Sequence, residues 1–218
     1  MATATGEAVG HARPMSRPYR ARGAVIAAAG LVLLGTWLML ARHETGAIDR
    51  FAFRVLALPS HGALAAAAPT VVAAAKAVLA VAALIVLGLL ARQRAWWDCV
   101  AIAVGAPVAQ AAAHLAKDAV ARPRPEHELV RAGGYSFPSS TSALGMGFAF
   151  LAIALARTLP ACRRVITAAG ALVTLALGLS FVALRVHYLS DVIAGWALGV
   201  IVYALCGLAP ELRRHRAP

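Results

Sequence analysis

The twenty residues LSDVIAGWALGVIVYALCGL, Leu189 to Leu208, decide the fold class of this chain. A single ionisable carboxylate, Asp191, interrupts them, and it lies near the start of the run. A helix needs about 20 mainly apolar residues to cross the hydrocarbon core of a bilayer. This stretch therefore predicts a membrane-spanning helix that carries an acidic side chain close to one end.

Five further apolar runs of similar length occur earlier in the chain. Together they predict an all-α polytopic membrane protein with six transmembrane helices. The composition agrees with this prediction, because 61% of the 218 residues are hydrophobic and only 14% are charged. Soluble domains are roughly 25% charged. The predicted spans are residues 23–41, 71–91, 95–116, 140–156, 165–184 and 189–208.

Two short basic segments flank this six-span domain of residues 23–208. Residues 1–22 lack apolar periodicity, which predicts a disordered N-terminus, and residues 209–218 form a basic tail. The first apolar run is longer than the 7–15 residues of a signal-peptide core, so we expect a retained first span. Between the first two spans, Ile48 to Ala68 carries apolar residues at helical spacing among charged ones, which predicts an interfacial helix.

The basic residues predict the orientation of the chain in a cell membrane. Six spans place both termini on one side, which holds twelve arginines, against eight basic residues on the other side. The excess predicts cytoplasmic termini. Because the arginines flank apolar runs, orientation also accounts for the net charge of +12, and no nucleic-acid partner is expected. Four of the eight outer charges lie between Lys117 and Arg131, against this trend, which indicates anion binding.

Two polar motifs stand at the outer ends of the predicted spans. KDAVARPRP contains Lys117 and Arg124, and HYLSD contains His187 and Asp191. A lysine and an arginine can hold a phosphate, and a carboxylate four residues after a histidine can orient its ring as a nucleophile or base. The alternatives are that the cations anchor lipid head groups and that the aspartate caps a helix. Because all four lie on the same predicted face, we favour a phosphate site.

With FPSSTSA, Phe137 to Ala143, these motifs resemble the membrane branch of the type 2 phosphatidic acid phosphatase family, the lipid phosphate phosphatases. That family carries K-x6-R-P, P-S-G-H and S-R-x5-H-x3-D on a six-span, acid-haloperoxidase-like helical core. The resemblance implies that His187 is the nucleophile of a phosphohistidine intermediate and that Asp191 orients it. The implied phosphate-binding residues are Lys117, Arg124, Ser139 and Ser140, the last in the place of the family's glycine.

The chain departs from the family pattern at two positions. The histidine that serves as the family's general acid is either replaced by Thr141 or deleted, and Phe181 stands where the family has an arginine. Arg185, one helical turn further on, is the candidate replacement for the arginine in phosphate binding. His114 and His127 are candidate replacement acids, although a histidine without a catalytic role is the simpler interpretation of each.

The expected function is hydrolysis of a lipid phosphate or a prenyl diphosphate, such as undecaprenyl diphosphate, at the outer face of the membrane. Losing the general acid favours diphosphates, whose leaving group needs that acid far less than an alkoxide does. No metal or cofactor is expected, because lysine and arginine supply the positive charge and no cluster of metal-ligating residues occurs.

The alternative is a catalytically impaired relative that binds a phosphorylated lipid or serves as a membrane partner. A six-span transporter is disfavoured, because its polar residues should lie near the midplane of the bilayer. The sequence predicts no oligomeric state.

Overall fold

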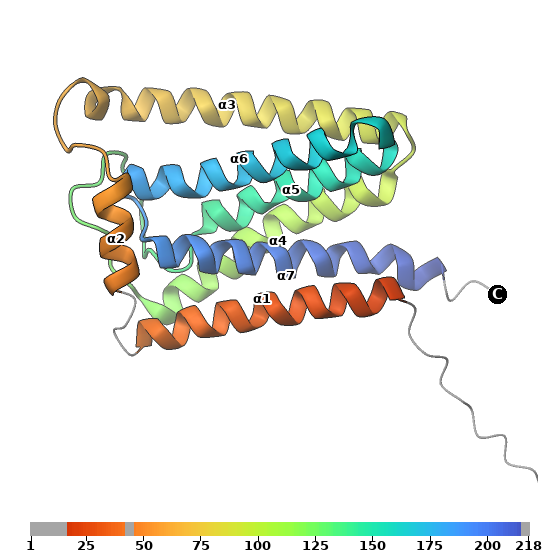
Figure 1. Cartoon of the computed structure of the whole chain (residues 1–218), viewed down its shortest axis with the longest axis horizontal. Coiled ribbons are helices and arrows are strands. Elements are labelled where there is room, and N and C mark those ends of the chain that lie inside the picture. Colours follow the sequence, from red (N-terminus) through yellow and green to blue (C-terminus); the bar gives the residue numbers. More distant parts are fainter. Residues whose placement is uncertain (1–16, 42–45, 215–218) are drawn as a thin grey trace, which may run out of the picture.

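The computed structural model describes residues 17–41 and 46–214, and all regular elements in these ranges are helical. Six long helices run side by side, and the short helix α2 lies across one end of the bundle (Figure 1). The elements are α1 (Arg17–Ala41), α2 (Gly46–Leu56), α3 (Ala63–Arg92), α4 (Trp96–Val120), α5 (Ser140–Thr158), the 3₁₀ turn η1 (Pro160–Cys162), α6 (Arg163–Ala183) and α7 (Leu189–Arg214).

The six long helices confirm the six predicted spans. Each is long and apolar enough to cross a membrane, and five of the six predicted runs match a helix to within a few residues. The second is longer than predicted, because α3 begins at Ala63 instead of residue 71. Its extra turns begin with ALAAAA, which consists of strong helix formers, and the helix continues through Pro69 and Thr70 into the apolar run.

The prediction that residues 48–68 form one helix is correct in its first half only. Helix α2 ends at Leu56, and the residues from Ala63 to Ala68 belong to α3. Gly62, whose φ of 96° favours glycine, stands directly before α3 and separates the two helices. One face of α2 buries Ala52 against Val182 and Val192, so α2 covers the adjoining ends of α6 and α7.

Glycines on α7 let it approach α5 closely. A Cβ added at Gly195 would lie 2.4 Å from the carbonyl oxygen of Ser139, and one at Gly199 would lie 2.6 Å from that of Ala143. Small residues at such crossings permit close packing of helices in membranes. The contact brings the first turns of both helices together, and the Ser139 amide donates to the Asp191 carbonyl at 3.0 Å.

The α4–α5 and α6–α7 connections meet at the end of the bundle that α2 covers, opposite the start of α1 and the end of α7 (Figure 1). We call the end that α2 covers the loop end, and the end that holds the start of α1 and the end of α7 the terminal end. The loop end holds Lys117, Ser139 and His187, which the sequence separates by up to seventy residues. Their convergence is a consequence of six antiparallel spans.

Candidate active site

His187 occupies the short connection between α6 and α7, and its side chain is only 3% exposed. Its backbone amide donates to the carbonyl of Phe181, which fixes the turn. Its Nε2 atom lies 3.3 Å from Nη1 of Arg124, and its Nδ1 atom lies 3.5 Å from Oδ2 of Asp191. The ring is thus placed between a cation and an anion.

The neighbours of the His187 ring assign its tautomer. A guanidinium can only donate, so Nε2 facing Arg124 must be the acceptor and Nδ1 carries the proton. At 3.5 Å the contact of Nδ1 with Asp191 is longer than a hydrogen bond, and the same carboxylate oxygen accepts the Tyr188 amide at 2.9 Å. The carboxylate therefore orients the ring electrostatically, and the lone pair of Nε2 points toward Arg124.

Burial lowers the pKa of His187 below its ordinary value of about 6.5. The nearby Asp191 opposes this shift, whereas the positive charges of Arg124 and Lys117 add to it. The net result is a ring that stays neutral at neutral pH. A neutral imidazole is the form that can act as a nucleophile.

Asp191 is fully buried, and Arg122 connects it to Asp49 of α2. The guanidinium of Arg122 pairs with Oδ1 of Asp191 and with Oδ2 of Asp49, and its Cζ lies 4.0 Å from the centroid of the Tyr188 ring. Burial would lower the pKa of Arg122, but the two carboxylates outweigh it and raise that pKa. Ser190 completes the network by donating its amide and hydroxyl to Asp49 at 2.9 and 2.8 Å.

Sequence reasoning missed both Arg122 and Asp49 as parts of the site. Arg122 stands two residues before Arg124 in the same basic loop, and only the fold shows which of the two arginines faces the histidine and which pairs with the carboxylates. Asp49 belongs to no motif and is 142 positions from Asp191. The one available signal was an acidic residue in a short amphipathic helix, a position that is usually solvated.

Lys117 lies in the last turn of α4 and is almost fully buried. Its Nζ donates to the carbonyls of Tyr135 (2.6 Å) and Ser136 (3.2 Å), which hold the segment leading to α5. The helix ends three residues later, where Ala121 adopts the left-handed conformation and its amide donates to the Lys117 carbonyl. The ammonium is thus fixed near His187 by backbone groups of the α4–α5 loop.

Arg124 extends from the same loop, and its three nitrogens all donate to backbone carbonyls. Nε binds Gly134, Nη2 binds Gly133, and Nη1 binds Val186, each at 2.9–3.0 Å. These carbonyls hold the cation beside His187, and the charge itself remains unneutralised by them. An anion that entered here would pair with this cation and would supply the opposite charge that the neutral carbonyls lack.

Ser139 caps α5, and its buried hydroxyl accepts from the amide of Ser142. Ser140 and Thr141 follow in the first turn and are half-buried. The first turn of α5 presents backbone N–H groups, which favour an anion. Ser139 is tied directly to Asp191 through its own amide, so the α5 start and the His187 turn form one unit.

The positions at which the chain departs from the family pattern, and the candidate replacements for the missing groups, do not join this cluster of polar contacts. The Phe181 ring is buried and faces the edge of the His187 ring, with 6.2 Å between centroids, so an apolar group occupies this position. Arg185 donates from Nε to the carbonyl of Leu58, in the loop after α2. His114 and His127 are both exposed. Within the described residues, contacts join Arg124 and Asp191 to His187, the charge of Lys117 acts on the same ring, and Arg185 is engaged elsewhere.

Comparisons with known proteins identify the family and agree with the fold. A family model described as the PAP2 superfamily matches residues 94–214, more than half of the chain. The fold is similar to the crystal structure of the first transmembrane PAP2 type phosphatidylglycerolphosphate phosphatase from Bacillus subtilis, with a TM-score of 0.71. The identity is 21%, and the match covers 88% of this chain and 98% of that one. No curated protein sequence matches this chain.

Proposed function

Since this chain belongs to the PAP2 superfamily, we propose that it removes phosphate from a phosphorylated membrane lipid, at the extracytoplasmic face, through a phosphohistidine at His187. The observation that carries the proposal is the ring of His187, held neutral with Nε2 toward Arg124 and Nδ1 toward Asp191. A neutral imidazole oriented by a buried carboxylate and facing a cation is suited to attack a phosphorus atom.

In the proposed first step, the lone pair of Nε2 forms a bond to phosphorus while the bond from phosphorus to the leaving oxygen breaks. The leaving oxygen keeps the bonding electron pair. The imidazole then carries a positive charge, which Asp191 stabilises through the retained Nδ1 proton. Arg124 and Lys117 supply positive charge to the phosphoryl oxygens. In the second step water attacks phosphorus, the nitrogen–phosphorus bond breaks, and neutral His187 and orthophosphate are released.

The leaving group decides how much the departure at Thr141 costs. A threonine hydroxyl is too weak an acid to protonate an alkoxide, and loss of a general acid costs about 10²–10⁴-fold. An alkoxide resembles hydroxide, whose conjugate acid has a pKa near 15.7, whereas a departing phosphate monoester has a relevant pKa of about 6. The proposed substrates are therefore prenyl diphosphates, of which undecaprenyl diphosphate is one, ahead of phosphatidic acid.

An apolar groove beside the site supports a lipid substrate. It has a volume of about 410 Å³ and lies between α1, α4 and α7. Its walls include Phe137 and Pro138, which directly precede Ser139, and Ala116, which precedes Lys117. A hydrocarbon chain in this groove would place its phosphorylated end against the loop end of the bundle. The solved PAP2 relative, by its name, acts on phosphatidylglycerolphosphate, which is likewise a phosphorylated lipid.

The test is phosphate release by the purified protein from undecaprenyl diphosphate and from phosphatidic acid, with His187→Ala as the control. We expect release from the diphosphate to exceed release from phosphatidic acid by about 10²-fold or more. Equal rates on the two lipids would contradict the role assigned to Thr141. Release that persists in His187→Ala would exclude the proposed nucleophile.

Thr141→His provides a gain-of-function arm for the same test. A restored acid should accelerate release from phosphatidic acid and leave release from the diphosphate nearly unchanged. If the parent chain releases no phosphate from either lipid yet binds both, the function is that of a phosphorylated-lipid-binding relative. That outcome would favour the view that Thr141 and Phe181 have removed turnover.

A further inference from the structure

Helix α2 brings a buried carboxylate to the site from outside the segment that the family model matches. The match covers residues 94–214, whereas α2 ends at Leu56. Asp49 lies on the inner face of α2, which crosses the loop end of the bundle (Figure 1), and its side chain is only 4% exposed. A carboxylate at such a position calls for a role, because taking a charge out of water is costly unless it is paired.

Backbone and aromatic contacts fix α2 against the turn between α6 and α7. The amide of Leu58, just after α2, donates to the carbonyl of Ala183 at 2.9 Å. The ring of Phe53 meets the ring of Tyr188 edge-on, with 5.6 Å between their centroids. Asp49 is therefore carried by a docked helix, which holds its carboxylate beside the first turn of α7.

Both oxygens of Asp49 accept hydrogen bonds from groups next to Asp191. Oδ1 accepts from the amide of Ser190 at 2.9 Å, and Oδ2 accepts from the hydroxyl of Ser190 and from Nη2 of Arg122, both at 2.8 Å. Nη1 of the same guanidinium pairs with Asp191 and donates to the Ser190 hydroxyl at 2.8 Å. Through Arg122, Asp49 thus reaches the carboxylate that orients His187.

The charge of Asp49 bears on how strongly Asp191 acts on the histidine. The guanidinium of Arg122 offsets part of the negative charge that Asp191 presents to the ring. Asp49 pairs with the same guanidinium and offsets part of its positive charge in turn. Asp191 therefore acts as a stronger anion toward His187 with Asp49 in place than without it. Because the proposed first step gives the imidazole a positive charge, that anion stabilises the transition state.

We propose that Asp49 is a positioning residue of the reaction: through Arg122 it holds Asp191 in place and preserves its negative charge toward His187. This role rests on the proposed hydrolysis, and it makes α2 a fourth part of the site beyond the three motifs of the family. A purely structural Asp49 would affect stability alone, whereas a positioning Asp49 also affects the chemistry at His187.

The test compares Asp49→Asn with the parent chain, purified in detergent, in phosphate release from undecaprenyl diphosphate. We expect kcat to fall about tenfold, within the 10–100-fold typical when an outer partner of a functional histidine is removed at a metal site. KM should stay nearly unchanged, because Asp49 reaches His187 only through other residues. A fall in stability at unchanged kcat would overturn the proposal.

The pH profile provides a second measurement, with a direction that the charges predict. Burial and the charges of Asp191, Arg124 and Lys117 set the pKa of His187. In Asp49→Asn the negative charge near the ring decreases, which lowers that pKa, so the neutral form persists to lower pH. The acidic limb of the kcat/KM profile should therefore move to lower pH. A limb that stays in place would overturn the proposal.

NMR titration of the His187 ring separates this role from the proposed hydrolysis. The signals of the ring are assigned by their loss in His187→Ala, and its pKa is measurable whether or not the chain releases phosphate. No release from the parent would overturn the hydrolysis, while a lower pKa in Asp49→Asn would still support the coupling of Asp49 to the histidine. An unchanged pKa would overturn that coupling at any rate of release.

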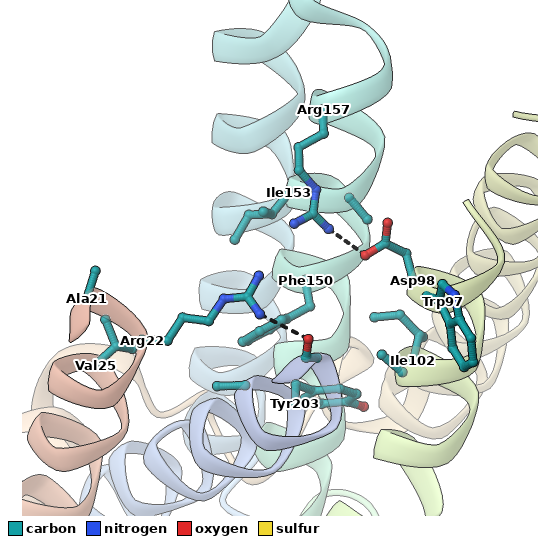
Figure 2. A pocket seen from close by; sticks show the side chains of 14 residues that line it. Ala21, Arg22, Val25, Trp97, Asp98, Ile102, Phe150, Ile153, Arg157 and Tyr203 are labelled. Carbon is teal, nitrogen blue, oxygen red and sulfur yellow. Dashed lines mark hydrogen bonds and ion pairs between the residues drawn. The ribbon is translucent and has the colours of Figure 1, made fainter. Parts of the chain in front are cut away.

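Two controls distinguish positioning from a loss of stability. Asp98→Asn is the same substitution at the terminal end, where Asp98 pairs with Arg157 and both line a pocket (Figure 2), and it should change neither kcat nor the limb. Phe53→Leu weakens the packing of α2 on Tyr188 but keeps the carboxylate, so it should lower thermal stability without moving the limb. A limb that moves equally in Phe53→Leu and Asp49→Asn would overturn the proposal.

Ser190→Ala replaces Asp49→Asn if that variant fails to fold. It removes the hydroxyl that bonds to both Asp49 and Arg122 and changes no charge. We expect a smaller fall in kcat, again with KM nearly unchanged. An unchanged kcat in a folded Ser190→Ala protein would show that the network does not act on His187.

Discussion

The two ends of the bundle each contain an arginine–aspartate pair, and the pairs differ in burial. At the loop end the side chains of Arg122 and Asp191 are 11% and 0% exposed, whereas at the terminal end those of Arg157 and Asp98 are 51% and 35% exposed. An exposed pair contributes about 0–1 kcal/mol and is screened by salt. A buried pair costs about 3–5 kcal/mol when one partner is removed, because it leaves an uncompensated charge. The arginine–aspartate pair is therefore rigid at the loop end, whereas the pair at the terminal end can change partners.

The buried pair belongs to a network that extends to α2. Asp49 anchors Arg122 from one side and Asp191 anchors it from the other, while Ser190 bonds to Asp49. Such a network fixes the carboxylate that orients His187 without depending on bulk solvent. Within the described part of the chain, the pair at the terminal end consists of Arg157 and Asp98 alone, and it faces a pocket.

The largest expected effect comes from Asp49→Asn, which breaks the buried network. An amide in place of the carboxylate removes one anionic partner of Arg122, and the free energy of unfolding should fall by about 3 kcal/mol. Thermal unfolding in detergent measures it, with Asp98→Asn at the terminal end as the matched comparison. An equal loss of unfolding free energy in the two variants would show that burial does not make the ion pair at the loop end more important for stability than the one at the terminal end.

Arg124→Gln tests the cation that faces His187. The loss of one charge on the transition state should lower phosphate release by about 10²–10³-fold, comparable to loss of an oxyanion donor. The acidic limb of the pH profile of kcat/KM should also move to higher pH. In the parent chain, burial together with Arg124 lowers the pKa of His187, so the neutral form persists below the ordinary value of about 6.5; removing the cation raises that pKa.

If the acidic limb of the kcat/KM profile stays at the same pH in Arg124→Gln, that result would contradict the electrostatic contact between Arg124 and His187. Arg131→Gln is the control, because Arg131 is an exposed arginine of the same loop. It should change neither the rate nor the position of the limb.

Gly195→Ala probes the close approach of α7 to α5 that holds the site together. The added methyl group would lie 2.4 Å from the Ser139 carbonyl oxygen, a backbone atom, and should destabilise the fold by about 1–3 kcal/mol. Gly30→Ala is the control, since a Cβ there meets nothing within 4 Å. Thermal unfolding of the two variants measures the difference, and equal stability would refute the tight crossing.

The smallest effect is expected for Asp98→Asn at the terminal end. Because the pair with Arg157 is exposed, the free energy of unfolding should change by less than about 1 kcal/mol, and the change should shrink further at high salt. Phosphate release should be unaffected, because Asp98 lies at the opposite end from His187. A loss as large as that of Asp49→Asn would remove the proposed contrast.

Sequence reasoning reached the six spans, the family and the convergence of Lys117 and His187 at one end, because each depends on local patterns. Apolar run length predicts a span without knowledge of its neighbours. The start of α3 was missed, because ALAAAAP reads equally well as the end of an interfacial segment and as the first turns of a span. The roles of Arg122 and Asp49 were missed, because neither lies at a motif position.

By itself, the sequence determined the membrane fold and the chemical types at the site: a histidine, a carboxylate and two cations at span ends. Only the tertiary structure decided which groups pair, because partner choice depends on the close crossing of α5 and α7 and on the placement of α2 over the loop end. It placed Arg124 at His187, Arg122 at Asp191 and Arg185 at the Leu58 carbonyl. These three arginines have the same side chain but different partners, because burial and backbone geometry differ from one position to the next. Both are properties of the folded chain.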